Sequence, residues 1–399
     1  MTNKTALLLS LLILLPSFSG CAGSGNAPAE TAAAQVQTET ESSVIQEDAP
    51  FYEKVLPMGR TYTDESGTVW MALSGSGMAF DVTGKSLKIK LAGDSGALVG
   101  QDGTKARVAV YLDGERVIDE MVDRREKELT VFEGDTERTA EVRVVKLSES
   151  TNSVCGVSAV ETDGSIKPAA EKALKMEFIG DSITCGYGVD DPEHKLTFKT
   201  DTEDCTKTYA YKTAEALDAD VSLVSYSGYG ICSGYTTNGK QNTNQLVPTY
   251  YDKFGFSYTS FGFEKKADTI EWDHSKFEPD VIVINLGTND ASWAGSNEEN
   301  QAVYISMYDE FVRHVREVHP DSYIICSLGI MGNQLYPCIE SMVEAYRKDT
   351  GDERISAFMF DVQDVNADGY ATDWHPTEAT HEKAAKKLTD YIRELGLAK

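Results

Sequence analysis

The sequence has few positive charges and no regular pattern of cysteines. Its 399 residues include 37 Lys and Arg against 64 Asp and Glu, which gives a formal net charge of −27. Such an acidic surface repels nucleic-acid phosphates and anionic lipids, so neither is an expected partner, whereas a neutral polysaccharide is compatible with it. The seven cysteines form no CxxC or Cys/His pattern and the histidines form no HxxxH pair. We therefore predict no metal site, and we assign no disulfide.

Long apolar runs are also scarce, and the clearest one lies at the N-terminus. Residues 6–15 follow a lysine and form an apolar run that is too short to span a bilayer but is typical of a secretion signal. Cys21 follows a Ser-Gly pair, as in bacterial lipoprotein cleavage sites, where the cysteine becomes the lipidated first residue. We therefore expect a signal peptide over 1–21, a disordered linker over 22–49 and an exported cell-surface lipoprotein, with plain secretion as the alternative.

Short strand-like runs dominate residues 50–165. They are rich in Val, Leu and Thr, and Gly or Asp turns separate them, as in SLKIKLAG, ARVAVYLDGERVID and TAEVRVVKLSES. Several alternate with a period of two, so that Val108, Val110 and Leu112 face one way. Regularly spaced strands with little helical pattern predict an antiparallel β-sandwich, followed by a connector over 164–172.

Strands and helices alternate from residue 173 onward. The strand-like segments are ALKMEFIG, VSLVSYSG, PDVIVINLG, SYIICSLG and ISAFMFDV, and amphipathic helical segments separate them. PDVIVINLG is largely apolar, as a strand that is buried on both faces requires. The alternation predicts a doubly wound parallel sheet with helices on both faces, which forms a second domain over 166–399.

Four short motifs fall beyond the predicted strand ends or in the final loop. Ser182 lies in FIGDSI, Gly228 in SYSGYG, Asn289 in NLGTND, and His375 precedes the last helix. Ligands of parallel sheets bind beyond the carboxyl ends of the strands. A serine hydroxyl needs a base to become a nucleophile, histidine titrates near neutral pH, and fixed N–H donors stabilise an acyl oxyanion. The four motifs therefore predict a serine hydrolase.

As a set, the motifs resemble the four blocks of the SGNH (GDSL-type) hydrolases over 173–399. With the sandwich before them, the chain resembles carbohydrate esterase family 2, whose members join a β-sandwich (jelly-roll) domain to an SGNH domain. The resemblance implies removal of O-acetyl groups from plant polysaccharides such as xylan and glucomannan, without a cofactor. It also implies Ser182 as the nucleophile, His375 as the base, and Gly228 and Asn289 in the oxyanion hole. We expect a monomer.

The final motif departs from the general SGNH pattern, in which Asp stands three residues before His. Thr372 occupies that place, and Asp373 stands two residues before His375. The imidazole needs an acceptor for its other N–H, because that contact fixes the tautomer. Members of carbohydrate esterase family 2 can use a Ser–His dyad in which a backbone carbonyl is the acceptor. Two alternatives follow, the Asp373 carboxylate or a nearby main-chain oxygen, and we rank the dyad first.

Three aromatic residues near the motifs are candidates for stacking against sugar rings. Trp374 adjoins His375 in a polar loop, Trp293 follows GTND, and Tyr229 follows Gly228. Each could instead belong to the hydrophobic core, which is the more common place for a single aromatic side chain.

Other polar residues near the motifs are interpreted as structural. We expect Asp181 and Asp290 to brace loops. The sequence DVNADG over 364–369 matches the start of a calcium-binding loop, but its twelfth position holds His375 instead of an acidic residue, so we predict a turn. The remaining histidines are expected at the surface: His194, His274, His314, His319 and His381.

Two alternative functions are compatible with the sequence. A lipase or thioesterase on the SGNH scaffold would need an extended apolar groove, whereas residues 229–245 are rich in Tyr, Ser, Gly and Asn, which favours a polar ligand. A non-catalytic carbohydrate-binding surface lipoprotein is the alternative from another class, and the intact Ser182, Asn289 and His375 argue against it.

Overall fold

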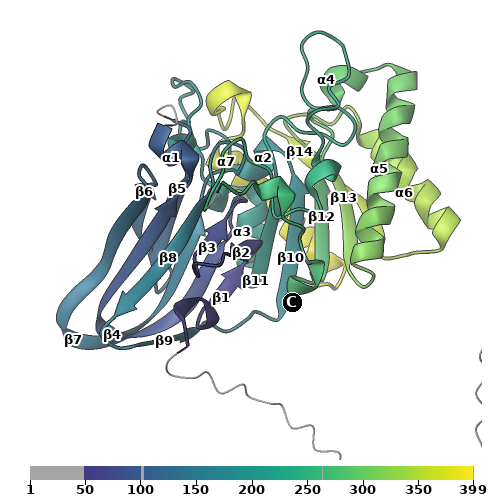
Figure 1. Cartoon of the computed structure of the whole chain (residues 1–399). Helices are drawn as coiled ribbons and strands as arrows, with labels where there is room; N and C mark the ends of the chain where they lie inside the picture. The colour runs from purple at the N-terminus through teal and green to yellow at the C-terminus, as the bar shows by residue number, and fades with distance from the viewer. Residues whose placement is uncertain (1–48, 100–102, 263, 399) are drawn as a thin grey trace, which may run out of the picture. The chain divides into compact units, whose positions relative to one another are not determined.

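The computed structural model describes residues 49–99, 103–262 and 264–398. The predicted signal peptide, Cys21 and the linker up to residue 48 lie outside these ranges. Within them, no helix combines the length and the apolar character needed to cross a bilayer. Two domains follow one another along the described chain, a β-domain (residues 50–168) and an α/β-domain (residues 174–398), as Figure 1 shows.

The β-domain is a nine-stranded antiparallel sheet with the order β2-β3-β8-β4-β7-β5-β6, to which β1 and β9 add by pairing with β4. Its elements are β1 (Leu56–Met58), β2 (Thr61–Thr63), β3 (Val69–Met71), β4 (Gly77–Gly93), α1 (Ser95–Val99), β5 (Arg107–Leu112), β6 (Glu115–Met121), β7 (Glu126–Lys146), β8 (Cys155–Thr162) and β9 (Ser165–Pro168).

Two long strands turn this single sheet into a sandwich. The first half of β4 pairs with β1, β9 and the second half of β7, whereas its second half pairs with β8 and the first half of β7. Register shifts after Gly84 and Leu87 separate the two halves, and such irregularities bend a strand. Apolar side chains of both halves are buried in one cluster, so the halves enclose a shared core: Phe80, Val82, Ile89 and Leu91.

The α/β-domain contains a five-stranded parallel sheet in the order β11-β10-β12-β13-β14. The chain enters at β10, adds β11 on one side and then β12 on the other, so the topological switch point lies at β10. The elements are β10 (Leu174–Gly180), α2 (Ser182–Cys185), α3 (Tyr209–Ala216), β11 (Ala219–Ser225), β12 (Val281–Asn285), α4 (Ala291–Ala294), α5 (Glu298–Val318), β13 (Tyr323–Ile330), α6 (Tyr336–Thr350), β14 (Ile355–Val362) and α7 (Glu378–Glu394).

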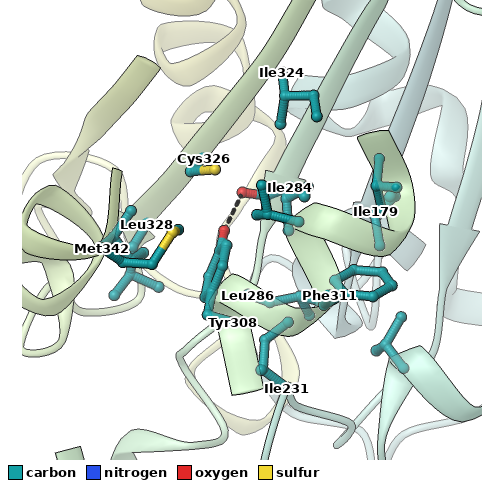
Figure 2. Packing of buried hydrophobic residues seen from close by; sticks show 14 of the residues in the cluster. Ile179, Ile231, Ile284, Leu286, Tyr308, Phe311, Ile324, Cys326, Leu328 and Met342 are labelled. Carbon is teal, nitrogen blue, oxygen red and sulfur yellow. Dashed lines mark hydrogen bonds between the residues drawn. The ribbon is translucent and has the colours of Figure 1, made fainter. Parts of the chain in front are cut away.

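Helices cover both faces of this sheet. On one face α5 and α6 pack together, and Tyr308 and Met342 meet the strand residues Ile284 and Leu328 in the core (Figure 2). The Tyr308 hydroxyl donates to the Ile284 carbonyl oxygen at 3.3 Å, which pairs a polar group inside this apolar layer. On the other face, α3 and α7 bury their apolar residues against β10 and β12. The helices leave the strand ends free, and the candidate motifs lie there.

A buried ion pair joins the two domains. Arg60, between β1 and β2, and Glu177, in β10, are each 1% exposed, and the Arg60 Nη2 lies 3.5 Å from the Glu177 Oε2. Arg60 also donates to the carbonyl oxygen of Tyr251, whose hydroxyl donates to the same Glu177 carboxylate at 2.9 Å. The contact between the domains therefore excludes water at this point, which makes it unlike a mobile interdomain surface.

These elements confirm the predicted fold class, with two differences in detail. The run SLKIKLAG (86–93), which looks like a strand of its own in the sequence, forms one strand, β4, with the residues from Gly77 onward. Residues 165–168, which were expected in the connector, form β9 and pair with β4, so the β-domain ends at Pro168 instead of at 165. The second difference concerns pairing between segments that are distant in sequence, which local alternation does not reveal.

Candidate active site

Ser182 is the first residue of a short helix that begins where β10 ends. Asp181 caps this helix, since its Oδ1 accepts the Ile183 N–H at 3.0 Å. A β-carbon at Gly180 would lie 2.1 Å from the Thr184 hydroxyl oxygen, so the tight passage from strand to helix requires glycine. Ser182 is thereby held at the carboxyl edge of the sheet, with 7% of the residue exposed.

His375 approaches Ser182 from the loop before α7. Its Nε2 lies 2.8 Å from the Ser182 Oγ, so the structure brings together two residues that are 193 positions apart. Asp373 and Trp374, just before the histidine, have φ angles of 52° and 66°. Such left-handed backbone is uncommon outside glycine, and it marks a sharp turn that directs the imidazole toward the sheet edge.

The second ring nitrogen of His375 contacts main chain. Its Nδ1 lies 3.1 Å from the Thr372 carbonyl oxygen, and the Thr372 hydroxyl donates to Asp191 at 2.9 Å, which anchors this segment. The Asp373 carboxylate instead accepts the Tyr187 hydroxyl at 2.9 Å. Of the two alternatives, the geometry matches the main-chain oxygen, and the catalytic role considered for the Asp373 carboxylate is not supported, because its left-handed backbone sends the side chain toward Tyr187.

Two aromatic rings that the sequence did not single out continue in a stack from one side of the imidazole. Tyr187 stacks on His375 with ring centroids 4.2 Å apart, and Phe198 stacks on Tyr187 at 3.7 Å. Burial lowers the pKa of His375 to about 4, although the hydrogen bond to the Thr372 carbonyl and the Asp373 charge oppose this shift. The imidazole is therefore neutral at neutral pH, as a base that accepts a serine proton must be.

The Asn289 side-chain amide lies between the two neighbouring motifs. Its Nδ2 donates to the Tyr229 carbonyl oxygen at 2.8 Å and lies 3.3 Å from the Asp181 Oδ2. These contacts tie the amide to the residue that follows Gly228 and to the residue that precedes Ser182. Three of the predicted motifs are therefore connected by hydrogen bonds at one edge of the sheet.

Gly228 leaves open space in front of its peptide. Its φ angle is 82°, and a β-carbon there would meet only the Gln245 Nε2, at 4.0 Å. Within the described ranges, the N–H groups of Gly228 and Ser182 donate to no protein acceptor. Both N–H groups are thus available to a ligand, which is what an oxyanion hole requires.

Asp290 and Asp181 brace loops, as expected. The Asp290 carboxylate accepts three consecutive backbone N–H groups at 3.1, 2.7 and 2.9 Å, which fixes the segment Ile231, Cys232 and Ser233. Burial raises the pKa of Asp181 to about 7, so this carboxyl group is partly protonated near neutral pH.

The three candidate aromatic residues occupy different environments. Trp374 is 60% exposed and stacks on Tyr370, with ring centroids 4.1 Å apart, so its outer face is open to solvent. Trp293 is partly buried against the core on the α5 and α6 side. Tyr229 is 2% exposed and lies inside that core, so its ring offers little surface to a substrate; its carbonyl oxygen holds Asn289.

Two of the histidines expected at the surface are buried. His381 is 1% exposed, and its Nδ1 accepts the backbone N–H of Tyr209 at the start of α3. His319 is 4% exposed and packs edge-on against His274. The helical pattern of α7 shows which face is apolar but not that a polar ring on that face finds a partner on another helix.

The segment that matches the start of a calcium loop forms a turn. The Asp364 carboxylate accepts the backbone N–H groups of Asn366 and Ala367 at 3.0 and 3.2 Å. Such a local side-chain contact is the usual reason for Asp at the start of a turn.

Two family models match this chain. The GDSL-like Lipase/Acylhydrolase family matches residues 178–383, more than half of the chain, and the Carbohydrate esterase 2 N-terminal family matches residues 57–170. The second match falls on the β-domain and the first on the α/β-domain.

Characterised relatives agree with these families. An acetylxylan esterase / glucomannan deacetylase of Cellvibrio japonicus is 24% identical over 341 residues, which cover 85% of this chain and 88% of that protein. A cellulase/esterase of Acetivibrio thermocellus is 34% identical over 231 residues, which cover 56% of this chain but only 26% of that protein.

Solved structures share the two-domain architecture. An acetyl xylan esterase from the rumen bacterium Butyrivibrio proteoclasticus matches with 26% identity and a TM-score of 0.76, over 87% of this chain and 96% of that one. A family two carbohydrate esterase from Clostridium thermocellum in complex with cellohexaose matches with 25% identity and a TM-score of 0.73, over 86% and 99%. The chain therefore belongs to the SGNH (GDSL-type) hydrolases and, within them, to carbohydrate esterase family 2.

Proposed function

We propose that this protein is a carbohydrate esterase that removes O-acetyl groups from plant polysaccharides through an acetyl-serine intermediate. The observation that carries the proposal is the 2.8 Å contact between the Ser182 Oγ and the His375 Nε2, with the opposite ring nitrogen 3.1 Å from a main-chain carbonyl. A hydroxyl, a neutral base and an acceptor that fixes the tautomer are what acyl transfer requires.

The first half of the proposed reaction forms the acetyl-enzyme. His375 Nε2 takes the Ser182 proton while the Oγ attacks the acetyl carbonyl carbon. The carbonyl oxygen becomes an oxyanion, to which the N–H groups of Ser182 and Gly228 donate. One N–H of the Asn289 amide also donates to it, in place of the 3.3 Å contact with Asp181. The tetrahedral intermediate then breaks its bond to the sugar oxygen, which leaves with the proton from His375 and leaves the acetyl group on Ser182.

The second half releases acetate. His375 takes a proton from water as the water oxygen attacks the acetyl carbon, and the same donors hold the second oxyanion. The bond to the Ser182 oxygen then breaks, and this oxygen recovers its proton from His375. In both halves, positive charge develops on the imidazole, which contacts the Thr372 carbonyl oxygen. Negative charge develops on the acyl oxygen, to which the proposed oxyanion donors bind.

The surroundings of the site support a polar, extended substrate. The open face of Trp374 offers a platform for the C–H face of a sugar ring, with Trp293 as a second candidate. The Tyr235 N–H donates to the Gly228 carbonyl oxygen, so the loop that contains Tyr235 adjoins the oxyanion peptide. This loop borders an open cavity of about 520 Å³ with polar lining residues, among them Asn238 and Asn242. A relative of this family is solved with cellohexaose, a neutral glucan.

The experiment that tests the function is acetate release from acetylated xylan, acetylated glucomannan and a simple sugar acetate. We expect release from the polysaccharides by the wild-type protein and a loss of at least ~10³-fold in Ser182→Ala, which lacks the nucleophile. Equal release by the two proteins would support a non-catalytic carbohydrate-binding role. Faster cleavage of long-chain p-nitrophenyl esters than of p-nitrophenyl acetate would instead support a lipase or thioesterase.

For its location we propose a cell-surface lipoprotein that is anchored through Cys21. The support is the short apolar run and the Ser-Gly-Cys sequence at its end. Cys21→Ala, expressed with its native signal in a bacterium fed a radiolabelled fatty acid, should lose the label that the wild-type protein incorporates. A protein that is unlabelled in both forms and found in the medium would support plain secretion.

A further inference from the structure

Glu149 belongs to the β-domain but contacts the loop that carries Gly228. It lies in the segment after β7 and is 2% exposed. Its Oε2 accepts the backbone N–H of Ser227 at 2.9 Å. Ser227 immediately precedes Gly228, so this contact holds the residue next to the glycine whose N–H is a proposed oxyanion donor.

The same carboxylate oxygen also lies against the helix that begins with Ser182. The Cys185 Sγ, at the end of α2, is 3.9 Å from the Glu149 Oε2 and 3.3 Å from the Ser225 Oγ. Glu149 therefore lies between the nucleophile helix and the end of β11. The Glu149 carboxyl group therefore contacts the helix that begins with Ser182 and the residue before Gly228. The N–H groups of Ser182 and Gly228 are the two proposed oxyanion donors.

A second layer of buried polar groups holds Glu149 in place. Its own N–H donates to the Glu203 Oε2 at 2.9 Å, and the Lys146 Nζ donates to its carbonyl oxygen at 2.9 Å. Lys146 and Glu203 are fully buried, and burial raises the pKa of both glutamates and lowers that of the lysine. These contacts hold the backbone of Glu149, so its carboxyl group reaches the Ser227 N–H from a fixed position.

We propose that Glu149 is a positioning residue that the β-domain contributes to the active site. By accepting the Ser227 N–H, it sets the orientation of the Gly228 peptide and so aims the Gly228 N–H at the acyl oxygen. The inference rests on the proposed esterase function and adds to it, since it makes the β-domain a part of the catalytic apparatus.

Two conservative variants separate the hydrogen bond from the charge. Glu149→Gln keeps the length and an acceptor oxygen for the Ser227 N–H but removes the charge. Glu149→Asp keeps the charge but shortens the side chain by one methylene, which moves the acceptor oxygen away from the Ser227 N–H. We expect Gln to retain kcat within a few-fold, and Asp to lower kcat about tenfold to a hundredfold with little change in KM, because displacements of about 1 Å in a catalytic group have effects of this size.

The matched control is Arg116→Gln, another change at the domain interface. Arg116 pairs with Asp204 at 2.7 Å and contacts none of the residues placed in the site. Rates are expressed per active site, counted by the p-nitrophenol that diethyl p-nitrophenyl phosphate releases on reacting with Ser182, so that loss of folded protein does not lower them. Arg116→Gln should then show a wild-type kcat.

Binding of methylboronic acid gives a second readout, because its tetrahedral serine adduct places an oxygen in the oxyanion hole. Its inhibition constant should rise in Glu149→Asp in proportion to the loss of kcat, and should not change in Glu149→Gln or Arg116→Gln. Wild-type kcat in Glu149→Asp, or equal losses in the Asp and Gln variants, would overturn the inference while the esterase stands. If the wild-type protein were no more active than Ser182→Ala, the proposed esterase function itself would be contradicted.

Discussion

At the scale of single residues, the imidazole of His375 has a main-chain partner where the general SGNH pattern has a carboxylate. Removing the carboxylate that orients the histidine of a serine protease costs about 10⁴-fold in rate. Asp373→Asn should cost far less here, within about threefold in kcat/KM, because the Nδ1 contacts the Thr372 carbonyl oxygen. The measurement is the rate on p-nitrophenyl acetate. A loss of a hundredfold or more would mean that the Asp373 charge, and not the carbonyl, supports the base.

The pH dependence of the reaction follows from the burial of the same ring. A histidine acts as a base only when it is neutral, and burial lowers the pKa of His375 to about 4. As the pH falls, kcat/KM should therefore stay level to about pH 5 and then decline through about pH 4. In Asp373→Asn the decline should move to lower pH, because the Asp373 charge favours the imidazolium. Circular dichroism at each pH confirms that the loss is not unfolding, and a decline near pH 6.5 would contradict the shift.

Residue types and order in the sequence suffice to identify Ser182 and His375 as a pair, since few side chains can act as a nucleophile or as its base. They do not identify Tyr187, which stacks on the imidazole, because nothing in its local sequence distinguishes it from a core tyrosine. Tyr229 adjoins a motif in sequence but its ring is buried in the core, because proximity in sequence does not determine where a side chain points. Orientation of a side chain depends on contacts that form only in the folded domain.

At the scale of elements, the passage from β10 into α2 depends on the absence of a side chain at Gly180. A β-carbon there would lie 2.1 Å from the Thr184 hydroxyl oxygen, so Gly180→Ala must displace the first turn of α2 and Ser182 with it. We expect a loss of kcat of at least tenfold and destabilisation of about 1–3 kcal/mol.

The matched control for that change is Gly134→Ala in β7, where a β-carbon would meet no atom within 4 Å. Its kcat should equal that of the wild-type protein. Kinetics and thermal unfolding of both variants check the prediction, and similar kcat values for the two would show that the turn can accommodate a methyl group.

Strand and helix positions in the α/β-domain follow closely from the sequence, because the parallel strands are mostly apolar and amphipathic helical segments separate them. The β-domain is less accessible to such reasoning. Its long strands β4 and β7 change partners halfway along, and only the pairing pattern shows that one sheet bends into two layers. Alternation of side chains predicts a strand but contains no information about which strand lies beside it.

At the scale of the whole molecule, the Arg60–Glu177 pair determines how strongly the domains depend on each other. Arg60→Met should destabilise the protein by about 3–5 kcal/mol, because it leaves Glu177 charged, buried and without its cation. Adding Glu177→Gln, which removes that charge and keeps an acceptor for the Tyr251 hydroxyl, should recover a large part of the loss. Urea unfolding of the single and double variants measures both effects.

The exposed pair Lys386–Asp390 provides the comparison for that experiment. Lys386→Met should change the unfolding free energy little, since water already solvates both groups. An Arg60→Met variant as stable as the wild-type protein would show that the buried pair contributes nothing net.

The same buried pair has a consequence for recombination. A breakpoint in the connector between Pro168 and Leu174 interrupts no helix or strand. It would nevertheless take Arg60 and Glu177 from different proteins, and the pair would be lost in a chimera if either parent has another residue at its position. Residues 50–398 should therefore be exchanged between proteins only as one cassette, and new modules are best joined outside it.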